Sequence, residues 1–308
     1  MAGTITIAHL SDVHLPPMQG FTPRHWNVKR ALGWLNWQRK RRFVHSRAAL
    51  DAIVADIKAQ APDHILVSGD LVNIGLPAEY EAALDWLKTV GPPDRVSVVP
   101  GNHDIYVPLA TDPGVALWAP YMTGEGMGGE LTFPYVRRAG CVAIVGLNSA
   151  VPTPVGLASG LLGQAQLDRL AATLDALKSE GLARLVMIHH PPLPVMAPRR
   201  RALVDAQALE SVLRRHGAEL VVFGHNHRNI RVMLGDIPVV GVASASAARA
   251  YHDEPAACYN LIRITRQDGR YRIAIKTLGI VGGGLRIGPQ NPCLSWAKSR
   301  SPVGKSQA

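Results

Sequence analysis

Side chains that can bind metals recur in this sequence at the ends of short apolar segments. Carboxylate, amide or imidazole groups follow five such segments, and they comprise Asp12 and His14, Asp70, Asn102 and His103, His189, and His225 and His227. Imidazole nitrogens combined with carboxylate and amide oxygens suit Zn²⁺, Mn²⁺ or Fe, whereas Mg²⁺ and Ca²⁺ prefer fewer imidazoles. The residue types therefore predict a metal site of the first kind.

The number of these candidate ligands favours two ions over one. Eight positions are too many for a single four-coordinate ion, but they suit two ions about 3.5–4 Å apart that share a bridging group. Asp70 is the natural bridge, because each of its two carboxylate oxygens could face one ion. Such a pair lowers the pKa of a bound water and holds the oxygens of a phosphorus centre during in-line displacement. The pattern thus predicts a dinuclear hydrolytic centre.

The segments that carry these residues are predicted to be strands of a layered α/β fold. Apolar, β-branched runs predict strands over 4–10, 64–70, 95–99, 132–138, 142–147, 185–188, 219–223, 230–234, 239–242, 259–265 and 271–278. Helical periodicity predicts helices over about 46–61, 78–90, 164–179 and 205–215. Ser46 and Asp205 are expected N-caps, and Gly181 an expected helix stop. Strands that alternate with helices and then continue alone are typical of a layered α/β architecture, in which ligands collect at the carboxyl ends of strands.

The ordered set of motifs resembles that of the calcineurin-like metallophosphoesterases. The match comprises Asp12-Val13-His14, Gly69-Asp70, Gly101-Asn102-His103-Asp104, His189-His190-Pro191 and Gly224-His225-Asn226-His227. The resemblance implies an α/β fold that forms a four-layer α/β/β/α sandwich. It also implies a dinuclear enzyme that hydrolyses phosphodiester bonds by metal-bound hydroxide, similar to the bacterial class III cyclic-nucleotide phosphodiesterases.

The same resemblance implies a role for each matched residue. The first ion would take Asp12, His14, Asp70 and His227, and the second Asp70, Asn102, His189 and His225. His103 would contact the scissile phosphate and protonate the leaving oxygen, with Asp104 orienting its imidazole. His190 would lie behind the ligands or face the substrate. The cofactors would be two divalent or trivalent ions of Mn, Fe or Zn.

A basic insert separates the first two motifs. The formal net charge is +10, and the chain has no acidic residue between Asp12 and Asp51, which favours an anionic partner. Residues 24–42 could form a plain surface helix, a lid that reads an anionic, partly apolar substrate through Trp34 and Trp37, or a peripheral membrane contact. A second basic run, Arg199-Arg200-Arg201, follows a proline-rich turn and could either hold the substrate or form a solvated loop.

The composition of the chain supports predictions about disulfides, cellular location and domain bounds. The three separated cysteines indicate neither a disulfide framework nor a cysteine zinc site. With no signal peptide or membrane span in the sequence, we expect a cytoplasmic protein, with attachment to the inner membrane face as the alternative. Residues 1–278 are predicted to form a single domain, with the insert at about 15–45, and residues 279–308 a flexible tail.

Other activities fit the sequence less well. Cyclic nucleotides are the first candidate substrates, and a UDP-2,3-diacylglucosamine-type pyrophosphate hydrolase acting on a lipid is the alternative. The positive charge alone supports a nuclease, so nucleic acid is the weakest of the candidate partners. A non-catalytic scaffold is disfavoured because every ligand position is retained. The oligomeric state is not predicted.

Overall fold

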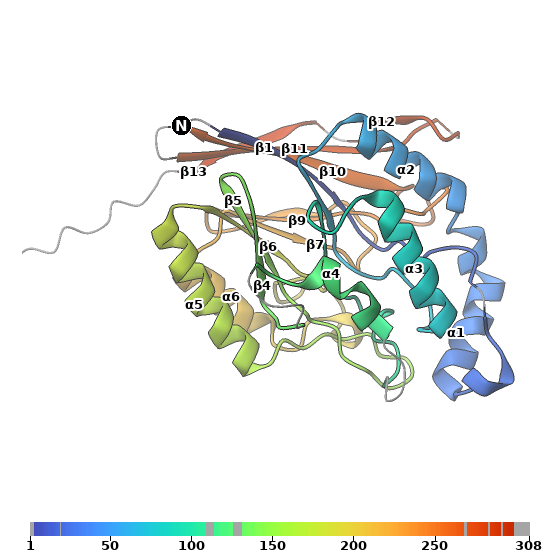
Figure 1. The fold of residues 1–308 in the computed structure, drawn as a ribbon. Coiled ribbons are helices and arrows are strands. Elements are labelled where there is room, and N and C mark those ends of the chain that lie inside the picture. Colours follow the sequence, from blue (N-terminus) through green and yellow to red (C-terminus); the bar gives the residue numbers. More distant parts are fainter. Residues whose placement is uncertain are drawn as a thin grey trace, which may run out of the picture.

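Two β-sheets packed face to face form the centre of the molecule, and helices cover their outer faces (Figure 1). The computed structural model describes residues 3–18, 20–108, 114–125, 131–267, 270–282, 284–290 and 292–298. The layers are helices, sheet, sheet and helices, so the predicted four-layer α/β/β/α sandwich is confirmed.

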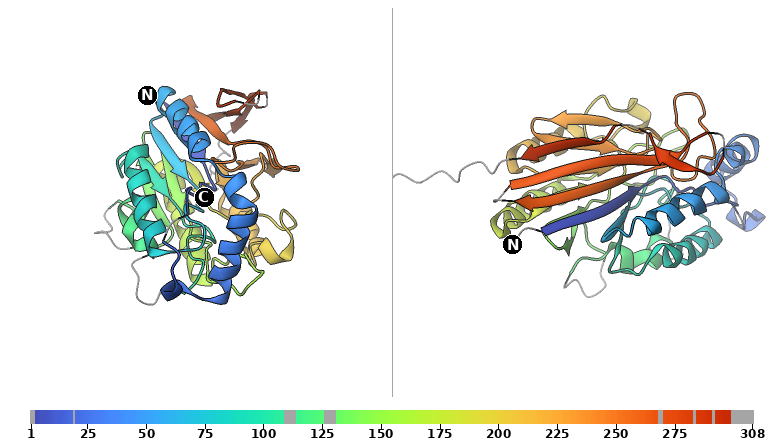
Figure 2. Two further views of the ribbon diagram at one scale, coloured as in Figure 1. Left: turned by 90° about the vertical axis from the view of Figure 1, so that its right-hand side faces the viewer. Right: turned by 90° about the horizontal axis from the view of Figure 1, so that it is seen from above.

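The first sheet joins the start of the chain to its end. In the described part of the chain it has seven strands in the order β12-β11-β10-β1-β2-β3, with β13 also paired to β11. Their bounds are β1 (Gly3–Leu10), β2 (His64–Val67), β3 (Val96–Val98), β10 (Cys258–Gln267), β11 (Arg270–Ile280), β12 (Ile287–Pro289) and β13 (Leu294–Lys298). Strand β1 pairs in parallel with β2 and antiparallel with β10, and Figure 2 shows the long β10 and β11 alongside it.

The second sheet has a parallel centre and antiparallel edges. Among the described residues it has six strands in the order β4-β5-β6-β7-β9-β8. Their bounds are β4 (Tyr135–Ala139), β5 (Val142–Gly146), β6 (Ala183–Met187), β7 (Leu220–Phe223), β8 (Arg231–Leu234) and β9 (Ile237–Gly241). Pairing is parallel from β5 through β6 and β7 to β9, so the carboxyl ends of these strands meet at one edge.

The central strands of the second sheet are apolar on both faces because each face borders a core. In β6, Leu185 and Met187 belong to the core between the sheets. The intervening Val186 belongs to a second core beneath helices α5 and α6. This burial on both faces explains why these strands are continuous apolar runs without polar alternation.

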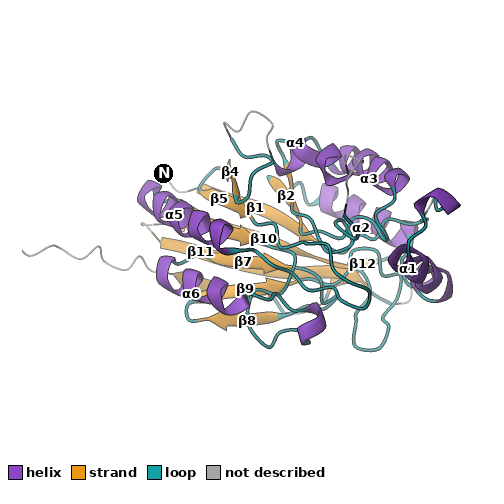
Figure 3. Ribbon diagram, turned by 90° about the horizontal axis from the view of Figure 1, so that it is seen from below, coloured by secondary structure: helices purple, strands orange, loops and turns teal. Residues whose placement is uncertain are grey.

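The helices divide between the two outer layers. Their bounds are α1 (Val28–Arg39), α2 (Arg47–Ala59), α3 (Pro77–Val90), α4 (Ala119–Met122), α5 (Gln164–Glu180) and α6 (Ala206–His216). Helices α5 and α6 cross the outer face of the second sheet (Figure 3). Helix α2 packs against β11 and β12 of the first sheet, and α3 lies beside it (Figure 1).

Two of the three expected helix signals are confirmed. The Ser46 side chain accepts a hydrogen bond from the Ala49 amide at the start of α2. Gly181 ends α5 with φ 69°, a left-handed conformation that suits glycine. Asp205 precedes α6, but its carboxylate accepts hydrogen bonds from the amides of Leu162 and Gly163 instead of capping that helix. Asp205 thus ties the loop before α5 to the loop before α6.

The end of the chain is more ordered than its composition predicts. Residues 287–289 and 294–298 are strands β12 and β13, which both pair with β11. The flexible tail expected over 279–308 is therefore wrong for these strands, because β11 offers them an edge for backbone pairing. Residues 299–308 lie outside the described residues. The single domain over 1–278 remains a prediction.

Candidate metal centre

The candidate ligands lie just beyond the carboxyl ends of strands from both sheets. Asp12 and His14 follow β1, Asp70 follows β2, and Asn102 follows β3 in the first sheet. The second sheet contributes His189 after β6, and His225 and His227 after β7. Packing the sheets face to face brings these loops together at one end of the molecule.

The backbone at these positions adopts a conformation that is costly for residues other than glycine. Five of the candidates have left-handed backbones, namely Asp12 (φ 53°), His14 (φ 40°), Asp70 (φ 55°), His225 (φ 68°) and His227 (φ 52°). Such residues cost on the order of 1–3 kcal/mol each and concentrate at functional sites. Two backbone hydrogen bonds hold the first loop, from Asp12 N to Gly69 O (3.0 Å) and from His14 N to Asp70 O (2.8 Å). These backbone conformations therefore lower the stability of the fold while they direct the five side chains toward one point.

Asp12, His14 and His227 form the first half of the centre. His227 Nε2 lies 3.2 Å from Asp12 Oδ1 and 3.3 Å from His14 Nε2. His14 Nδ1 faces the Val72 carbonyl, and His227 Nδ1 faces the Glu254 carboxylate. Because both of these partners can only accept, each Nδ1 carries a proton and each Nε2 faces inward. Burial opposes the charged form of His227, but the Asp12 and Glu254 carboxylates raise its pKa to about 9, so without metal its Nε2 also carries a proton. A cation that displaced this proton would meet two imidazole nitrogens and a carboxylate oxygen at one position.

Asn102, His189 and His225 form the second half. His189 Nε2 lies 3.2 Å from Asn102 Oδ1 and 3.2 Å from His225 Nδ1. Its Nδ1 donates to the Ser68 carbonyl at 2.7 Å, so Nε2 faces the other two groups. Burial opposes the charged form of His189, but the Asp70 carboxylate raises its pKa to about 9, so without metal Nε2 carries a proton that a cation would displace. Burial lowers the pKa of His225 well below its ordinary value, so that ring is neutral and able to bind a metal.

Asp70 lies between the two halves. Its Oδ2 is 3.8 Å from His14 Nε2 and 3.5 Å from His189 Nε2, while Oδ1 accepts a hydrogen bond from the His103 amide at 2.7 Å. From the sequence we expect each carboxylate oxygen to face one ion. The structure differs, because Oδ1 is bonded to the His103 amide, and Oδ2 alone faces both halves of the centre.

Buried atoms without a hydrogen bond support a cation at this site. Among the described residues, Asp12 Oδ1 and His225 Nε2 are buried side-chain atoms that make no hydrogen bond, although Asp12 Oδ1 lies 3.2 Å from His227 Nε2. Buried polar atoms without hydrogen bonds are rare in proteins and need an explanation. Both residues belong to candidate clusters whose ligand atoms all lie within 4.8 Å of one another. The donor set therefore fits two borderline metal ions.

Asp104 does not orient His103, contrary to the expectation from sequence. Its buried carboxylate accepts hydrogen bonds from the amides of Gly101, Asp70, Leu71 and Val72. These donors belong to the two loops that carry Asn102 and Asp70. Asp104 therefore fixes the backbone beneath the candidate ligands.

His103 is positioned by three other residues. Its Nδ1 donates to the Asn73 carbonyl, and its Nε2 lies 3.1 Å from Arg41 Nη1. Its ring is nearly parallel to that of Tyr106, with centroids 5.4 Å apart. Burial, together with the Arg41 charge, lowers the pKa of His103 to about 4. The ring is therefore neutral and accepts a hydrogen bond from Arg41.

His190 faces neither the substrate space nor the ligand atoms. Its side chain is fully buried, with Nδ1 2.8 Å from the Ser149 hydroxyl and Nε2 3.2 Å from the Ala158 carbonyl. Its ring packs on His225 with centroids 4.6 Å apart. The substrate contact predicted for His190 is therefore wrong, and the residue supports His225 from behind.

The tryptophans of the basic insert do not line the central cavity. Trp37 is buried and stacks on His45, with centroids 6.3 Å apart. Trp34 stacks on Phe21 at the surface. The insert instead brings Arg41 to the centre. Membrane contact through residues 24–42 stays a prediction, and no helix among the described residues is long and apolar enough to cross a membrane.

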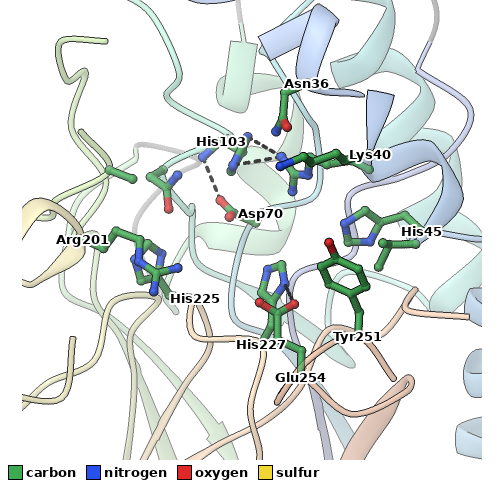
Figure 4. Close-up of a pocket in the computed structure, with 14 residues that line it drawn as sticks. Asn36, Lys40, His45, Asp70, His103, Arg201, His225, His227, Tyr251 and Glu254 are labelled. Atoms are coloured by element: carbon green, nitrogen blue, oxygen red, sulfur yellow. Dashed lines mark hydrogen bonds and ion pairs between the residues drawn. The ribbon is translucent and has the colours of Figure 1, made fainter. Parts of the chain in front are cut away.

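A cavity of about 350 Å³ opens over the metal centre (Figure 4). Arg201 lines it, whereas Arg199 does not, and Arg200 lines only a neighbouring cavity. The sequence does not single out Arg41, His45, Tyr251 or Glu254 as site residues, although all four line the central cavity. The basic run pointed toward Arg41. No motif pointed to Tyr251 or Glu254, which lie beyond the last matched motif.

Comparison with known proteins places these features in one family. A family model described as calcineurin-like phosphoesterase matches residues 5–229. A Synechococcus protein named "Probable cyclic nucleotide phosphodiesterase" is 32% identical over 180 residues, which are 58% of this chain and 62% of the relative. The glycerophosphodiester phosphodiesterase GpdQ of Enterobacter lignolyticus is 26% identical over 195 residues, or 60% and 64% of the two chains. The match thus spans less than two thirds of either relative.

Solved structures share the fold at low sequence identity. A dimetal phosphatase from Danio rerio superposes with a TM-score of 0.62 at 16% identity, covering 94% of this chain and 98% of the other. A purple acid phosphatase from yellow lupin gives a TM-score of 0.52 at 11% identity, covering 90% and 52%. At these identities the likeness concerns the fold alone.

Proposed function

The chain belongs to the calcineurin-like phosphoesterase family, and we propose that it hydrolyses phosphodiester bonds with two metal ions. The observation that carries this proposal is the convergence of seven metal-binding side chains beside an arginine–histidine pair that faces the same cavity. The first group suits a dinuclear centre, and the pair can bind and protonate a phosphate ester.

The candidate ligands divide naturally between two ions. Asp12, His14 and His227 would hold one ion, and Asn102, His189 and His225 the other. Asp70 would be shared through Oδ2. When bound, two such ions supply an activated water and neutralise charge on the phosphoryl oxygens. We propose Mn, Fe or Zn, because the ligand set is rich in imidazole.

Arg41 and His103 would act on the substrate together. A guanidinium donates two parallel hydrogen bonds to phosphoryl oxygens better than any other side chain. An anionic substrate would therefore compete with His103 Nε2 for Arg41, which at present donates to that nitrogen. Once released, Nε2 faces the cavity. It could then take up a proton from solvent in the cavity and pass it to the leaving oxygen, as the family resemblance implies.

The relatives suggest small phosphodiesters as substrates. One is named for cyclic nucleotides and the other for glycerophosphodiesters, and we propose substrates of this general kind. A lipid-linked diphosphate is a second candidate. It is favoured by three exposed apolar side chains that line the cavity next to the central one. They are Leu32, Val155 and Leu157, which are 48%, 50% and 42% exposed.

Hydrolysis of bis-p-nitrophenyl phosphate by Mn²⁺-reconstituted protein tests the proposal. We expect turnover that is lost in His225→Ala together with one bound ion per chain, measured by inductively coupled plasma mass spectrometry. The matched control is His216→Ala, which removes a histidine that pairs with Asp175 on helix α5, away from the cavity. This control should retain both metal content and rate.

A substrate screen then separates the candidates. The panel comprises cyclic nucleotides, glycerophosphodiesters, UDP-diacylglucosamine and single-stranded nucleic acid. Failure to cleave any diester by protein that carries two ions per chain would refute the phosphodiesterase proposal. Binding of fewer than two ions by the folded wild-type protein would refute the dinuclear centre.

A further inference from the structure

A second cavity opens beside the central one and is lined by basic side chains that the proposed chemistry does not use. This side cavity, of about 430 Å³, is bordered by Lys29 of helix α1, by Tyr106, and by Arg200 and Arg201 of a short 3-10 helix (Arg199–Arg201). Asn102, His103 and Arg201 line both cavities. The two spaces are therefore adjacent, so a substrate bound at the candidate metal ligands lies beside the side cavity.

The cations of the side cavity form no ion pairs with acidic side chains among the described residues. Lys29 Nζ donates to the carbonyl and hydroxyl oxygens of Thr153 at 2.7 and 3.0 Å, and burial lowers the pKa of Lys29 to about 8. Arg201 acts electrostatically on the Glu254 carboxylate of the central cavity. Lys29 and Arg200 thus bring positive charge to the side cavity from two separate chain segments.

The aromatic side chain in this cavity is already engaged. The His103 ring lies nearly parallel to Tyr106, and Lys29 Nζ stands 4.4 Å from the Tyr106 ring centroid. A nucleobase that stacked on Tyr106 would have to displace one of them. The cavity therefore offers positive charge more readily than a stacking surface.

We propose that the side cavity is an anion subsite that binds a second phosphoryl group of the substrate. The inference rests on the proposed phosphodiesterase function and narrows it. The favoured substrates are phosphodiesters with a further phosphate on one of their alcohol substituents. A cyclic mononucleotide has no second phosphate to place there. One such phosphate could be carried by a nucleotide or by a phosphorylated lipid headgroup.

The affinities of two matched pairs of ligands test directly whether the subsite binds a phosphate. Isothermal titration calorimetry on Mn²⁺-loaded protein compares thymidine 3′,5′-bisphosphate with thymidine 5′-monophosphate. It also compares dioctanoyl phosphatidylinositol 4-phosphate with dioctanoyl phosphatidylinositol. A phosphate that gains a charge-assisted hydrogen bond should bind about tenfold more tightly or better. We expect this advantage in at least one pair, and the pair that shows it identifies the source of the phosphate.

Variants test whether the named cations cause the advantage. Arg200→Gln and Lys29→Gln should each reduce the ratio of the two affinities to about threefold or less. Arg199→Gln is the matched control, because it removes the same charge from the same 3-10 helix at a position outside both cavities. It should leave the ratio unchanged. Circular dichroism checks that each variant is folded.

The outcomes separate the subsite from the proposed function. Equal affinities within both pairs, or equal losses in Arg199→Gln and Arg200→Gln, would overturn the subsite. The p-nitrophenyl esters of thymidine 5′-phosphate, with and without a 3′-phosphate, are assayed in parallel. If neither ester is cleaved while the affinity ratio persists, the phosphodiesterase proposal fails and the anion subsite stands. If both esters are cleaved equally and the affinities within each ligand pair are equal, the phosphodiesterase proposal stands and the anion subsite is overturned.

Discussion

Arg41 donates a hydrogen bond from Nη1 to Nε2 of His103, 3.1 Å away, within the cavity above the candidate metal ligands. The direction is fixed because His103 Nδ1 donates to the Asn73 carbonyl, which leaves Nε2 as an acceptor. Arg41 forms no ion pair with any described carboxylate. The basic insert thus supplies a cation to the residue that the family resemblance makes the proton donor.

Replacing Arg41 with Gln should slow diester hydrolysis without removing metal. Loss of a charge-assisted hydrogen bond to a phosphoryl oxygen should lower kcat/KM for bis-p-nitrophenyl phosphate about 10- to 100-fold. Arg41→Lys should recover only part of this loss, because an ammonium cannot reproduce the paired donors of a guanidinium. The measurements are steady-state kinetics and metal content.

The adjacent arginine provides the control for this prediction. Arg42 is exposed, and its side chain donates to Gln38 outside the cavity. Arg42→Gln should keep kcat/KM within about twofold of wild type, since a distant exposed charge is largely screened. Equal losses in the two variants would show that Arg41 acts only through the net charge of the insert.

The ligand positions could be predicted from sequence because they depend on local order along the chain. Asp12, Asp70 and His189 each follow a short apolar run, and parallel strands bring their carboxyl ends to one edge. The apolar periodicity therefore indicates a layered α/β fold with candidate ligands at strand ends, whereas the four-layer sandwich and the division of ligands between two ions follow from the family resemblance.

Other roles depend on side-chain directions that spacing does not encode. Asp104 is adjacent to His103 in sequence, yet it points toward backbone amides of the Asp70 loop. His190 follows His189 and their rings meet edge to face with centroids 5.1 Å apart, yet His190 bonds the Ser149 hydroxyl and not the other candidate ligands. Glu254 reaches His227 from a loop whose path follows from tertiary packing alone.

Asp104→Asn should destabilise the fold more than it changes the chemistry of His103. An amide cannot accept all the hydrogen bonds that the carboxylate receives from the Gly101, Asp70, Leu71 and Val72 amides. We expect a loss of roughly 2–4 kcal/mol in the free energy of unfolding, measured by urea denaturation. The exposed Asp85→Asn, which breaks only a surface pair with Lys88, should change stability by less than about 0.5 kcal/mol.

One result would instead support the role implied by the family resemblance, in which Asp104 orients His103. If Asp104→Asn unfolded at the same urea concentration as wild type but shifted the pH profile of hydrolysis, Asp104 would act on His103 after all.

Glu254→Gln should weaken the binding of one metal ion. The Glu254 carboxylate accepts from His227 Nδ1 at 3.2 Å and so keeps Nε2 directed at Asp12 and the candidate metal position. Removing such a partner typically costs about 10- to 100-fold in metal affinity. Titration of the metal-free protein with Mn²⁺ should show one of its two affinities reduced.

The neighbouring carboxylate tests whether this effect is specific. Asp253 pairs with Arg228 at the surface and does not line the cavity. Asp253→Asn should keep both Mn²⁺ affinities. Unchanged affinities in Glu254→Gln would mean that His227 is held by packing alone.

His64 should make the stability of the fold depend on pH. Burial, followed by the charges of Arg137 and Arg95, lowers the pKa of His64 from an ordinary 6.5 to about 4, and the neutral ring bonds the Ser97 hydroxyl at 2.8 Å. Because the unfolded chain binds this proton more tightly, its contribution is fully present above pH 6.5 and is lost as the pH falls toward 4. The loss should approach about 3 kcal/mol. Urea denaturation of wild type and His64→Gln from pH 7.5 to 4.5 should therefore give converging stabilities, and parallel curves would show that His64 does not titrate in this window.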